Sequence, residues 1–467
     1  MSSPIRKLFG TDGVRGQAGR FPLDQSTLRT VGASLASHLA RARAAKNSNS
    51  PPLIVVGRDT RESGPWLEEA LIEGAIEAGA RCQSAGVITT PGVAFLARSL
   101  PADAGVVISA SHNPYQDNGF KIFAPSGRKL DDETERLIEA DILAKQSLAP
   151  RDVPVTHLEK VPSQAEQSAS TLQARYLEFL ENDIGAGLSL ANYSIVIDSA
   201  NGASFRLAPE LFKRLGARVT VINNEPDGRN INLNSGSMHI EGLQQQVTAT
   251  AADLGVAYDG DADRALFVDS QGRYVDGDAV LWVLSNHLES RNQLPNGLVV
   301  ATVMSNIGLE IALRSRGLQL VRTDVGDKYV LDELIRSGAN LGGEQSGHII
   351  LPQLSLAGDG MITTLCLLRA MTEAEKPLHE LTAGFTSYPQ ILVNVNVFEK
   401  RPFAEVEEIR KLISETETKL ADRGRLLLRY SGTEPVARIM IEGDDQLTIE
   451  AYARNLAMAI RETLGAR

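Results

Sequence analysis

The chain has 467 residues, of which 43% are hydrophobic, and a formal net charge of -11. This length predicts about three domains, because one domain typically takes ~150 residues. The acidic balance argues against nucleic acid or an anionic membrane as the main partner, whereas an anionic small molecule would need only a local basic pocket.

The sequence contains few features that would direct the protein to a membrane or to an oxidising compartment. The N-terminal residues lack the apolar core of a signal peptide, and no run reaches the ~18 apolar residues of a membrane span. The two cysteines, Cys82 and Cys366, give neither a disulfide framework nor a zinc-ligand spacing. We therefore expect a cytoplasmic protein.

Short apolar strands alternate with amphipathic helices along most of the chain, which is the pattern of α/β proteins. The first part predicts a strand at 53–57 and helices at 63–79 and 131–146, followed by a linker at 147–163. The middle predicts helices at 164–182, near 211, at 279–290 and at 307–315, and strands at 195–198, 219–222, 256–258, 298–301 and 318–321. The last part predicts strands at 391–397, 425–429 and 437–442, and helices at 403–420 and 446–463.

The pattern changes after about residue 373, where the alternation gives way to a smaller α+β arrangement. The sequence therefore predicts three α/β domains and a C-terminal α+β domain. Their predicted bounds are 1–155, 156–258, 259–373 and 374–467.

A strand-type apolar run ends in a serine and histidine loop. The loop begins Ser109-Ala110-Ser111-His112, and Asn-Pro and Asn-Gly turn signals follow it. This predicts that Ser111 lies on a tight loop at a strand end, where a scaffold can hold it in a cleft. A solvated turn is the alternative, because these residue types are common in turns. His112 and the nearby Lys121 favour a functional loop, and the residues alone leave both interpretations open.

Three carboxylates alternate on a second loop, directly after a predicted strand. Asp259, Asp261 and Asp263 would converge on a hard divalent cation. Without a cation, such crowding would raise the pKa of some of them. The sixth and twelfth loop positions are Arg264 and Ser270, which disfavours an EF-hand calcium site. A solvated acidic turn is the alternative, but the regular spacing favours a metal.

A third loop combines hydrogen-bonding side chains with flanking glycines. It carries Glu344, Gln345, Ser346 and His348. Such a loop suits recognition of a polyhydroxy ligand, although on its own it is equally compatible with an ordinary polar loop.

A fourth motif lies between two predicted strands near the C-terminus. Arg429 can make a forked contact to phosphate, and Ser431, Gly432 and Thr433 can form an anion-binding turn. A plain hairpin turn is the alternative, and both descriptions can hold together.

A fifth motif lies near the N-terminus, at 9–16, where three glycines surround Arg15. It predicts a loop that approaches a ligand closely. It matches neither a P-loop nor a dinucleotide-binding loop.

In this order, the motifs resemble those of the α-D-phosphohexomutase superfamily, over essentially the whole chain. The Ser111 loop resembles the phosphoserine loop, and the loop at 259–264 resembles the magnesium loop. The loop at 343–348 resembles the sugar-binding loop, and the one at 429–435 the phosphate-binding loop. The resemblance implies three similar α/β domains with mixed sheets plus a smaller C-terminal α+β domain, around a central cleft to which each gives one loop.

The motif at 9–16 and the glutamine at Gln345 resemble the glucosamine-phosphate branch, since the phosphomannomutase/phosphoglucomutase branch typically has Met there. The implied activity is an isomerase that interconverts glucosamine 6-phosphate and glucosamine 1-phosphate through a 1,6-bisphosphate. This reaction would feed UDP-N-acetylglucosamine and cell-wall precursor synthesis. Two departures are Lys328, where Arg is usual, and Ser235, where Cys is common.

The resemblance also implies roles for single residues. Ser111 would carry the phosphoryl group, and one Mg²⁺ per subunit would bind to a phosphoserine oxygen and the three aspartates. His112 and Lys121 would transfer protons, and Arg15 would steady the phosphoryl group. The substrate-binding residues would be Arg264, Glu344, Ser346, His348, Arg429, Ser431, Gly432 and Thr433. An amino-sugar phosphate would be the small-molecule partner, without nucleic acid or membrane, and a homodimer is left open.

Three other functions are weighed against this one. The nearest is the same chemistry on glucose or mannose phosphate. The second is an aspartyl-phosphate-type phosphatase with Asp259 and Asp261 as nucleophile and acid, which gives the serine loop no role. The third is an inactive regulator that binds a sugar phosphate, against which the complete set of candidate catalytic residues weighs.

Overall fold

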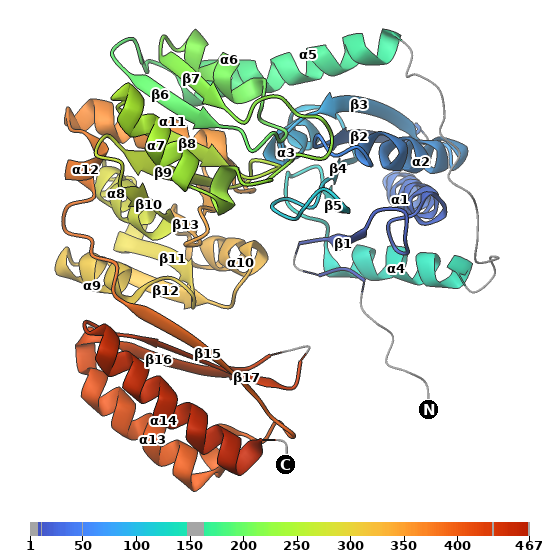
Figure 1. Cartoon of the computed structure of the whole chain (residues 1–467). Coiled ribbons are helices and arrows are strands. Elements are labelled where there is room, and N and C mark those ends of the chain that lie inside the picture. Colours follow the sequence, from blue (N-terminus) through green and yellow to red (C-terminus); the bar gives the residue numbers. More distant parts are fainter. Residues whose placement is uncertain (1–7, 11, 49, 147–162, 432–433, 466–467) are drawn as a thin grey trace. The chain divides into compact units, whose positions relative to one another are not determined.

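The computed structural model describes residues 8–146 and 163–465, apart from positions 11, 49, 432 and 433. These residues form two compact units (Figure 1). Unit 1 comprises Met1–Val303 and Val321–Thr382, and unit 2 comprises Met304–Leu320 and Ala383–Arg467. The predicted fold class, α/β with a smaller C-terminal α+β part, is confirmed.

The first sheet of unit 1 is mixed. Its sheet and helices are β1 (Val14–Gln17), α1 (Gln25–Ala45), β2 (Leu53–Arg58), α2 (Gly64–Glu77), β3 (Arg81–Val87), α3 (Thr90–Ser99), β4 (Ala104–Ile108), β5 (Asp117–Phe123) and α4 (Asp132–Gln146). The strand order is β1-β5-β4-β2-β3. β3, β2 and β4 are parallel to one another, β5 is antiparallel to β4, and β1 is antiparallel to β5.

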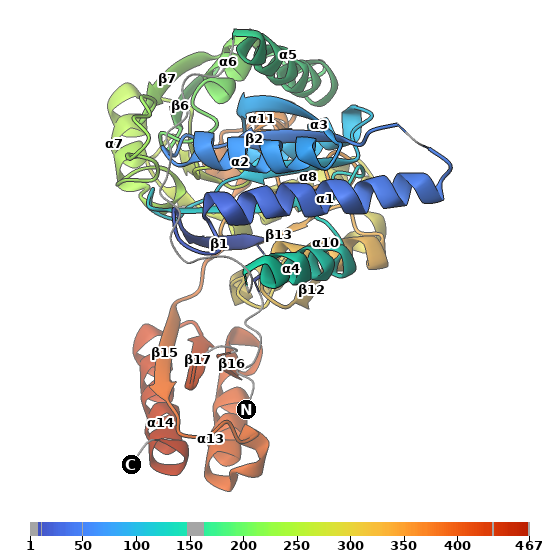
Figure 2. The same cartoon turned by 90° about the vertical axis from the view of Figure 1, so that its right-hand side faces the viewer.

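Side-chain alternation along the first sheet decides which helices cover each face. Ile54 and Val56 of β2 point into a core shared with α1, α2 and α4, which lie together in Figure 2. On the other face, the sheet approaches α3 so closely that a Cβ at Gly105 would lie 3.0 Å from Val93. The sheet is therefore buried on both sides, as expected for parallel strands.

The second and third sheets repeat this plan. The second region holds α5 (Ser163–Phe179), β6 (Ser194–Asp198), α6 (Leu207–Arg214), β7 (Arg218–Ile222), α7 (Glu241–Thr250), β8 (Leu254–Tyr258), β9 (Ala265–Asp269) and β10 (Tyr274–Val275). The third holds α8 (Gly277–Ser290), β11 (Leu298–Thr302), β12 (Gln319–Thr323), α10 (Asp327–Ser337), β13 (Gly342–Gly343), β14 (Ile349–Ile350), α11 (Gly360–Ala374) and α12 (Leu378–Leu381). The orders are β10-β9-β8-β6-β7 and β12-β11-β13-β14.

The three sheets share one connection that matters for the site. In each, a parallel strand turns back into an antiparallel neighbour: β4 into β5, β8 into β9 and β13 into β14. The three connecting loops carry the Ser111, Asp259 and Glu344 motifs, respectively. The fold therefore places these motifs at equivalent positions in three similar sheets.

The structure differs from the predicted domain bounds at 373/374, which falls within α11 of unit 1, and at 258/259. The predicted boundary at 258/259 falls inside the second sheet, because β8 pairs with β9 and Tyr258 lies opposite Ala265. The Asp259-Gly260 pair in this loop is a hairpin turn signal, but the prediction used it only as part of a metal loop. The boundary at 155/156 and all but the last residue of the predicted linker at 147–163 lie outside the described residues, and Ser163 begins α5.

The last three residues of the N-terminal motif, 14–16, belong to a strand. Val14 to Gln17 form β1, which pairs with β5. Gly13 has φ +78°, and a Cβ there would overlap the carbonyl oxygen of Phe120. Phe9 packs edge-on against the Phe120 ring, with 5.7 Å between centroids. Gly13 therefore allows close approach to the neighbouring strand, and the close approach of this motif to a ligand stays a prediction.

Unit 2 contains a three-stranded sheet that is covered by helices on one face. It contains α9 (Ile307–Ser315), β15 (Gln390–Asn396), α13 (Glu407–Leu420), β16 (Arg425–Tyr430), β17 (Val436–Glu442) and α14 (Gln446–Leu464). The order β15-β17-β16 is antiparallel throughout. α13 and α14 cover one face (Figure 1), where Val395, Ile439 and Leu456 share a core.

The predicted strands and helices are present, with ends that differ by a few residues. Elements that the sequence left unassigned include α1 and β5. Cys82 and Cys366 are free thiols. Among the helices of the described residues, none is both long and apolar enough to cross a membrane.

A glycine contact between α1 and α2 gives the first prediction. A Cβ at Gly74 would overlap the carbonyl oxygen of Arg29, whereas a Cβ at Gly242 in α7 meets nothing within 4 Å. Gly74→Ala should lower the free energy of unfolding by about 1–3 kcal/mol through overpacking. Gly242→Ala, the matched control, should leave it unchanged or raise it. Thermal unfolding measures both, and an unchanged melting temperature for Gly74→Ala would contradict the packing.

Candidate active site

Ser111 lies at the start of the β4–β5 loop, buried and with a left-handed backbone of φ +51°. Its Oγ donates a hydrogen bond to Oδ2 of Asp259 over 2.5 Å. The same oxygen lies 3.2 Å from Nδ1 of His112. The loop therefore points this hydroxyl at the carboxylates of the β8–β9 loop.

The neighbouring Ser109 is oriented differently. Its Oγ donates to Oδ2 of Asp59 over 2.6 Å and accepts a hydrogen bond from the Ser111 N–H over 2.9 Å. Ser109 thus holds the loop from behind. Of the two serines, Ser111 is the one whose hydroxyl meets the three-aspartate loop.

The three aspartates form a buried cluster. Ligand oxygens of Asp259, Asp261 and Asp263 all lie within 4.8 Å of one another. Burial, together with Asp263 and Asp261, raises the pKa of Asp259 well above its usual value. Oδ1 of Asp261 and Oδ1 of Asp263 are buried, and neither has a hydrogen-bond partner among the described residues. Buried oxygens with unused lone pairs suit a hard cation, so the cluster can hold a metal ion.

Lys121 of β5 neutralises part of this negative charge. Its Nζ lies 3.0 Å from Oδ2 of Asp261 and 2.9 Å from Oδ2 of Asp263. Burial would lower the pKa of Lys121, but the two carboxylates outweigh burial and raise it above its ordinary value. Lys121 is therefore cationic in this arrangement, and it donates hydrogen bonds.

His112 has the opposite character. Burial, followed by the positive charges of Arg264 and Arg15, lowers the pKa of His112 to about 4. At neutral pH its imidazole is therefore uncharged, so one ring nitrogen can accept a proton. A neutral imidazole therefore lies beside the Ser111 hydroxyl, and a cationic ammonium lies beside Asp261 and Asp263.

Arg15 and Arg264 contribute positive charge to this region. Nη1 of Arg15 lies 3.4 Å from Oδ1 of Asn113, on the Ser111 loop. Nε of Arg264 lies 3.9 Å from Oδ1 of Asp263. Nε of each arginine is buried, and within the described part of the chain neither has a hydrogen-bond partner. These donors suit an anion such as a phosphoryl group.

The β13–β14 loop joins the same cluster. Oε1 of Glu344 accepts a hydrogen bond from the Gly326 N–H, and Oε2 accepts one from Ser346, each over 3.1 Å. His348 lies between two carboxylates, with Nδ1 3.7 Å from Asp263 and Nε2 3.7 Å from Asp327. Burial would lower the pKa of His348, but these carboxylates raise it to about 9.

The fourth motif belongs to unit 2. Arg429 is exposed on β16, and Ser431 follows this strand. Nζ of Lys400 donates to the carbonyl oxygen of Ser431 over 2.6 Å. Gly432 and Thr433 lie outside the described residues, so the anion-binding turn stays a prediction.

Comparison with known proteins decides the family. Models of the phosphoglucomutase/phosphomannomutase family match along almost the whole chain. They describe alpha/beta/alpha domain I at residues 6–149, domain II at 174–272, domain III at 276–388 and the C-terminal domain at 392–459. The chain belongs to the phosphoglucomutase/phosphomannomutase family. Its members are mutases, a class of isomerases.

Individual relatives agree with this assignment. A phosphoglucosamine mutase of Solibacter usitatus is 48% identical over 98% of this chain and 99% of its own length. One of Moorella thermoacetica is 47% identical over 95% of this chain and 97% of its own. The crystal structure of a family protein from Burkholderia thailandensis, at 24% identity, covers 98% of this chain and 97% of its own with a TM-score of 0.76, and shows the same fold.

Three residues that hold the Ser111 loop in place are absent from the sequence-based predictions. Asp59 and Arg61 follow β2, and Asn232 comes from the second sheet region. A sequence pattern does mark Asp59 and Arg61, because they are charged residues directly after a buried strand, β2, which runs parallel to β4. Carboxyl ends of parallel strands meet at one edge of a sheet. No sequence pattern marked Asn232.

The two departures from the glucosamine branch have ordinary surroundings. Nζ of Lys328 forms an ion pair with Asp132 of α4. Ser235 is buried, and its hydroxyl has no hydrogen-bond partner among the described residues.

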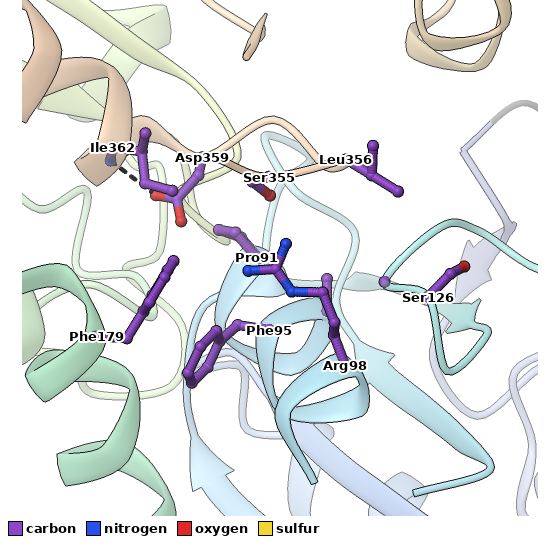
Figure 3. Close-up of a pocket in the computed structure, with 11 residues that line it drawn as sticks. Pro91, Phe95, Arg98, Ser126, Phe179, Ser355, Leu356, Asp359 and Ile362 are labelled. Atoms are coloured by element: carbon purple, nitrogen blue, oxygen red, sulfur yellow. Dashed lines mark hydrogen bonds between the residues drawn. The ribbon is translucent and has the colours of Figure 1, made fainter. Parts of the chain in front are cut away.

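A small pocket lies outside this cluster, between α3, the end of α5 and the segment before α11 (Figure 3). Arg98 reaches into it beside Phe179, whose ring stacks on Phe95 with 4.3 Å between centroids. Asp359 accepts a hydrogen bond from the Ile362 N–H at the start of α11. The cavity volume is about 10 Å³, which is room for about one water molecule. It is too small for a sugar phosphate.

The aspartate cluster gives the second prediction. A divalent cation such as Mg²⁺ should raise the melting temperature of the wild-type protein, because a ligand that binds only the folded state stabilises it. Asp261→Asn should remove most of this shift, since it deletes one anionic ligand. Asp269→Asn replaces a buried aspartate of β9 outside the cluster. This control should lower the melting temperature but keep the Mg²⁺ shift. An undiminished shift in Asp261→Asn would rule out the cluster as the cation site.

Proposed function

We propose that the chain is a phosphoglucosamine mutase that interconverts glucosamine 6-phosphate and glucosamine 1-phosphate in the cytoplasm. The observation that carries the proposal is the contact between the Ser111 hydroxyl and Asp259, within a cluster of three buried carboxylates. A serine in this position can be a phosphoryl carrier beside a cation site. The names of the curated relatives supply the substrate.

The reaction begins in this proposal with a phosphate on Ser111. The bond between phosphorus and Ser111 Oγ breaks while phosphorus bonds to a sugar hydroxyl oxygen. The proton of that hydroxyl passes to a base, for which the uncharged imidazole of His112 is the candidate, and a proton reaches Ser111 Oγ, for which the ammonium of Lys121 is the candidate donor. Phosphoryl transfer has a loose transition state, so the residues act mainly by positioning and by stabilising charge.

The second transfer uses the resulting glucosamine 1,6-bisphosphate. Ser111 Oγ loses its proton and attacks the other phosphate, the bond from that phosphate to the sugar oxygen breaks, and the sugar oxygen takes up a proton, so that Ser111 again carries a phosphate. Glu344 and Ser346 would hold sugar hydroxyls in both orientations, as would His348. Water must be excluded meanwhile, because it would hydrolyse the phosphoserine.

Charged residues have defined tasks in both steps. Asp259, Asp261 and Asp263 would hold one Mg²⁺, which when bound neutralises charge on the transferred group. The buried donors of Arg15 and Arg264 would contact the phosphoryl oxygens. By resemblance to the family's phosphate-binding loop, the second phosphate would contact Arg429, Ser431, Gly432 and Thr433 of unit 2.

The third prediction concerns the carrier. Purified protein should carry one phosphate, which peptide mapping places on Ser111. Ser111→Ala should lack this phosphate and have no mutase activity, because the P–O bond has no oxygen to form on. Ser109→Ala, the matched control, should keep the phosphate on Ser111. Mutase activity near wild type in Ser111→Ala would exclude this carrier, and a phosphoenzyme labile to hydroxylamine would instead indicate an aspartyl phosphate.

The fourth prediction concerns the sugar. The value of kcat/KM should be higher for glucosamine 1-phosphate than for glucose 1-phosphate, both measured with the wild-type enzyme. Mannose 1-phosphate serves as a third substrate. A higher value for glucose or mannose 1-phosphate would assign the enzyme to that branch of the family and leave the phosphoserine chemistry intact.

A further inference from the structure

The Ser111 loop carries its reactive residue in a strained backbone. Ser111 has φ +51°, a left-handed conformation that is unfavourable for a residue with a side chain. Such a conformation persists only where surrounding contacts fix it. The contacts that could do so are those made to the carbonyl oxygens of the loop.

Arg61 holds the loop from the first sheet. Its side chain is fully buried, and Nε donates to Oδ2 of Asp59 over 2.9 Å. Nη2 donates to the carbonyl oxygen of Ser111 over 2.9 Å and to that of Asn113 over 2.8 Å. Nη1 donates to the carbonyl oxygen of Pro114. The forked guanidinium thus binds three loop carbonyls at once, which an ammonium cannot reproduce.

Asn232 holds the same two carbonyls from the second sheet region. Nδ2 of Asn232 donates to the carbonyl oxygen of Ser111 over 2.9 Å and to that of Asn113 over 3.1 Å. An amide NH₂ and a guanidinium NH₂ each have two hydrogens, so each can supply both bonds. The four hydrogens of Arg61 Nη2 and Asn232 Nδ2 thus match the four lone pairs of the Ser111 and Asn113 carbonyl oxygens.

The carboxylate loop leaves room for this contact. A Cβ at Gly260, between the first two aspartates of the cluster, would lie 2.5 Å from the carbonyl oxygen of Ser111 and 2.9 Å from Nδ2 of Asn232. A side chain at this position would therefore displace the loop or the amide. The Ser111 carbonyl, the amide of Asn232 and the backbone of the carboxylate loop pack directly on one another.

We propose that Arg61 and Asn232 are positioning residues that clamp the carbonyl oxygens of Ser111 and Asn113 and thereby aim the Ser111 hydroxyl at Asp259. The inference rests on the proposed function for its kinetic consequence. The clamp joins the first sheet, which supplies Ser111, to the second sheet, which supplies Asp259. Loss of either Arg61 or Asn232 would leave the catalytic groups present, but Ser111 Oγ would be less precisely placed.

The fifth prediction tests the amide side. Asn232→Ala should lower kcat by about 10–100-fold, because a small misplacement of a reacting atom has an effect of this size. KM should change by less than about threefold, since Asn232 contacts the loop and not the ligand. Asn232 has φ +60°, so Asn232→Gly should give the same loss of kcat without backbone strain.

Asn201 provides the matched control. It is equally buried and has φ +48°, and among the described residues its side chain bonds only to backbone groups of Glu225 and Asn230. Asn201→Ala should therefore lower the melting temperature as Asn232→Ala does, but keep kcat close to that of the wild type. A kcat for Asn232→Gly equal to that of Asn201→Ala would overturn the proposal.

The arginine side is tested in a double-mutant cycle. Arg61→Lys keeps the charge but not the fork. Because both residues bind the same carbonyls, the losses of kcat in Arg61→Lys and Asn232→Ala should be non-additive. Arg61→Lys combined with Asn201→Ala should be additive. Additive losses in the first pair would contradict a shared clamp.

Hydrogen–deuterium exchange tests the clamp independently of turnover. Amides in the peptide at 109–119 should exchange faster in Asn232→Gly than in the wild type, and not in Asn201→Ala. If the wild type has no mutase activity, the proposed function fails while this measurement still tests the clamp. Unchanged exchange in Asn232→Gly would overturn it.

Discussion

The structure of the site depends on burying three carboxylates together. Asp259, Asp261 and Asp263 lie in a low-dielectric interior, where negative charges so close would repel strongly without compensation. The raised pKa of Asp259 expresses this cost. Lys121 offsets part of it, and the unused oxygens of the cluster are suited to a cation. A cation held there would neutralise charge on a transferred phosphoryl group.

A repeated connection brings the necessary groups to this cluster. In three similar sheets, a parallel strand turns back into an antiparallel neighbour, and each turn carries one motif. Because each loop is short and anchored by two paired strands, its side chains have little freedom. The serine loop, the carboxylate loop and the loop of Glu344 and His348 are therefore positioned by the backbone of three separate sheets.

Precision at Ser111 comes from groups that never need to touch a ligand. Ser109 binds the Ser111 N–H, while Arg61 and Asn232 bind its carbonyl oxygen. The peptide groups on both sides of the reactive residue are thus fixed. Its strained backbone is held by buried hydrogen bonds, which are costly to leave unmade.

The sequence by itself determined the α/β alternation, the position of most strands and the chemistry of each motif, because hydrophobic periodicity and residue type are local properties. Ser111 and the aspartates could be singled out in this way. Only the tertiary structure decided that the Ser111 hydroxyl meets Asp259, that Lys121 pairs with the next two aspartates and that β8 continues into β9. It also revealed Asn232, whose role depends on a contact 121 positions away in the chain. Such contacts follow from how sheets pack, which no local pattern records.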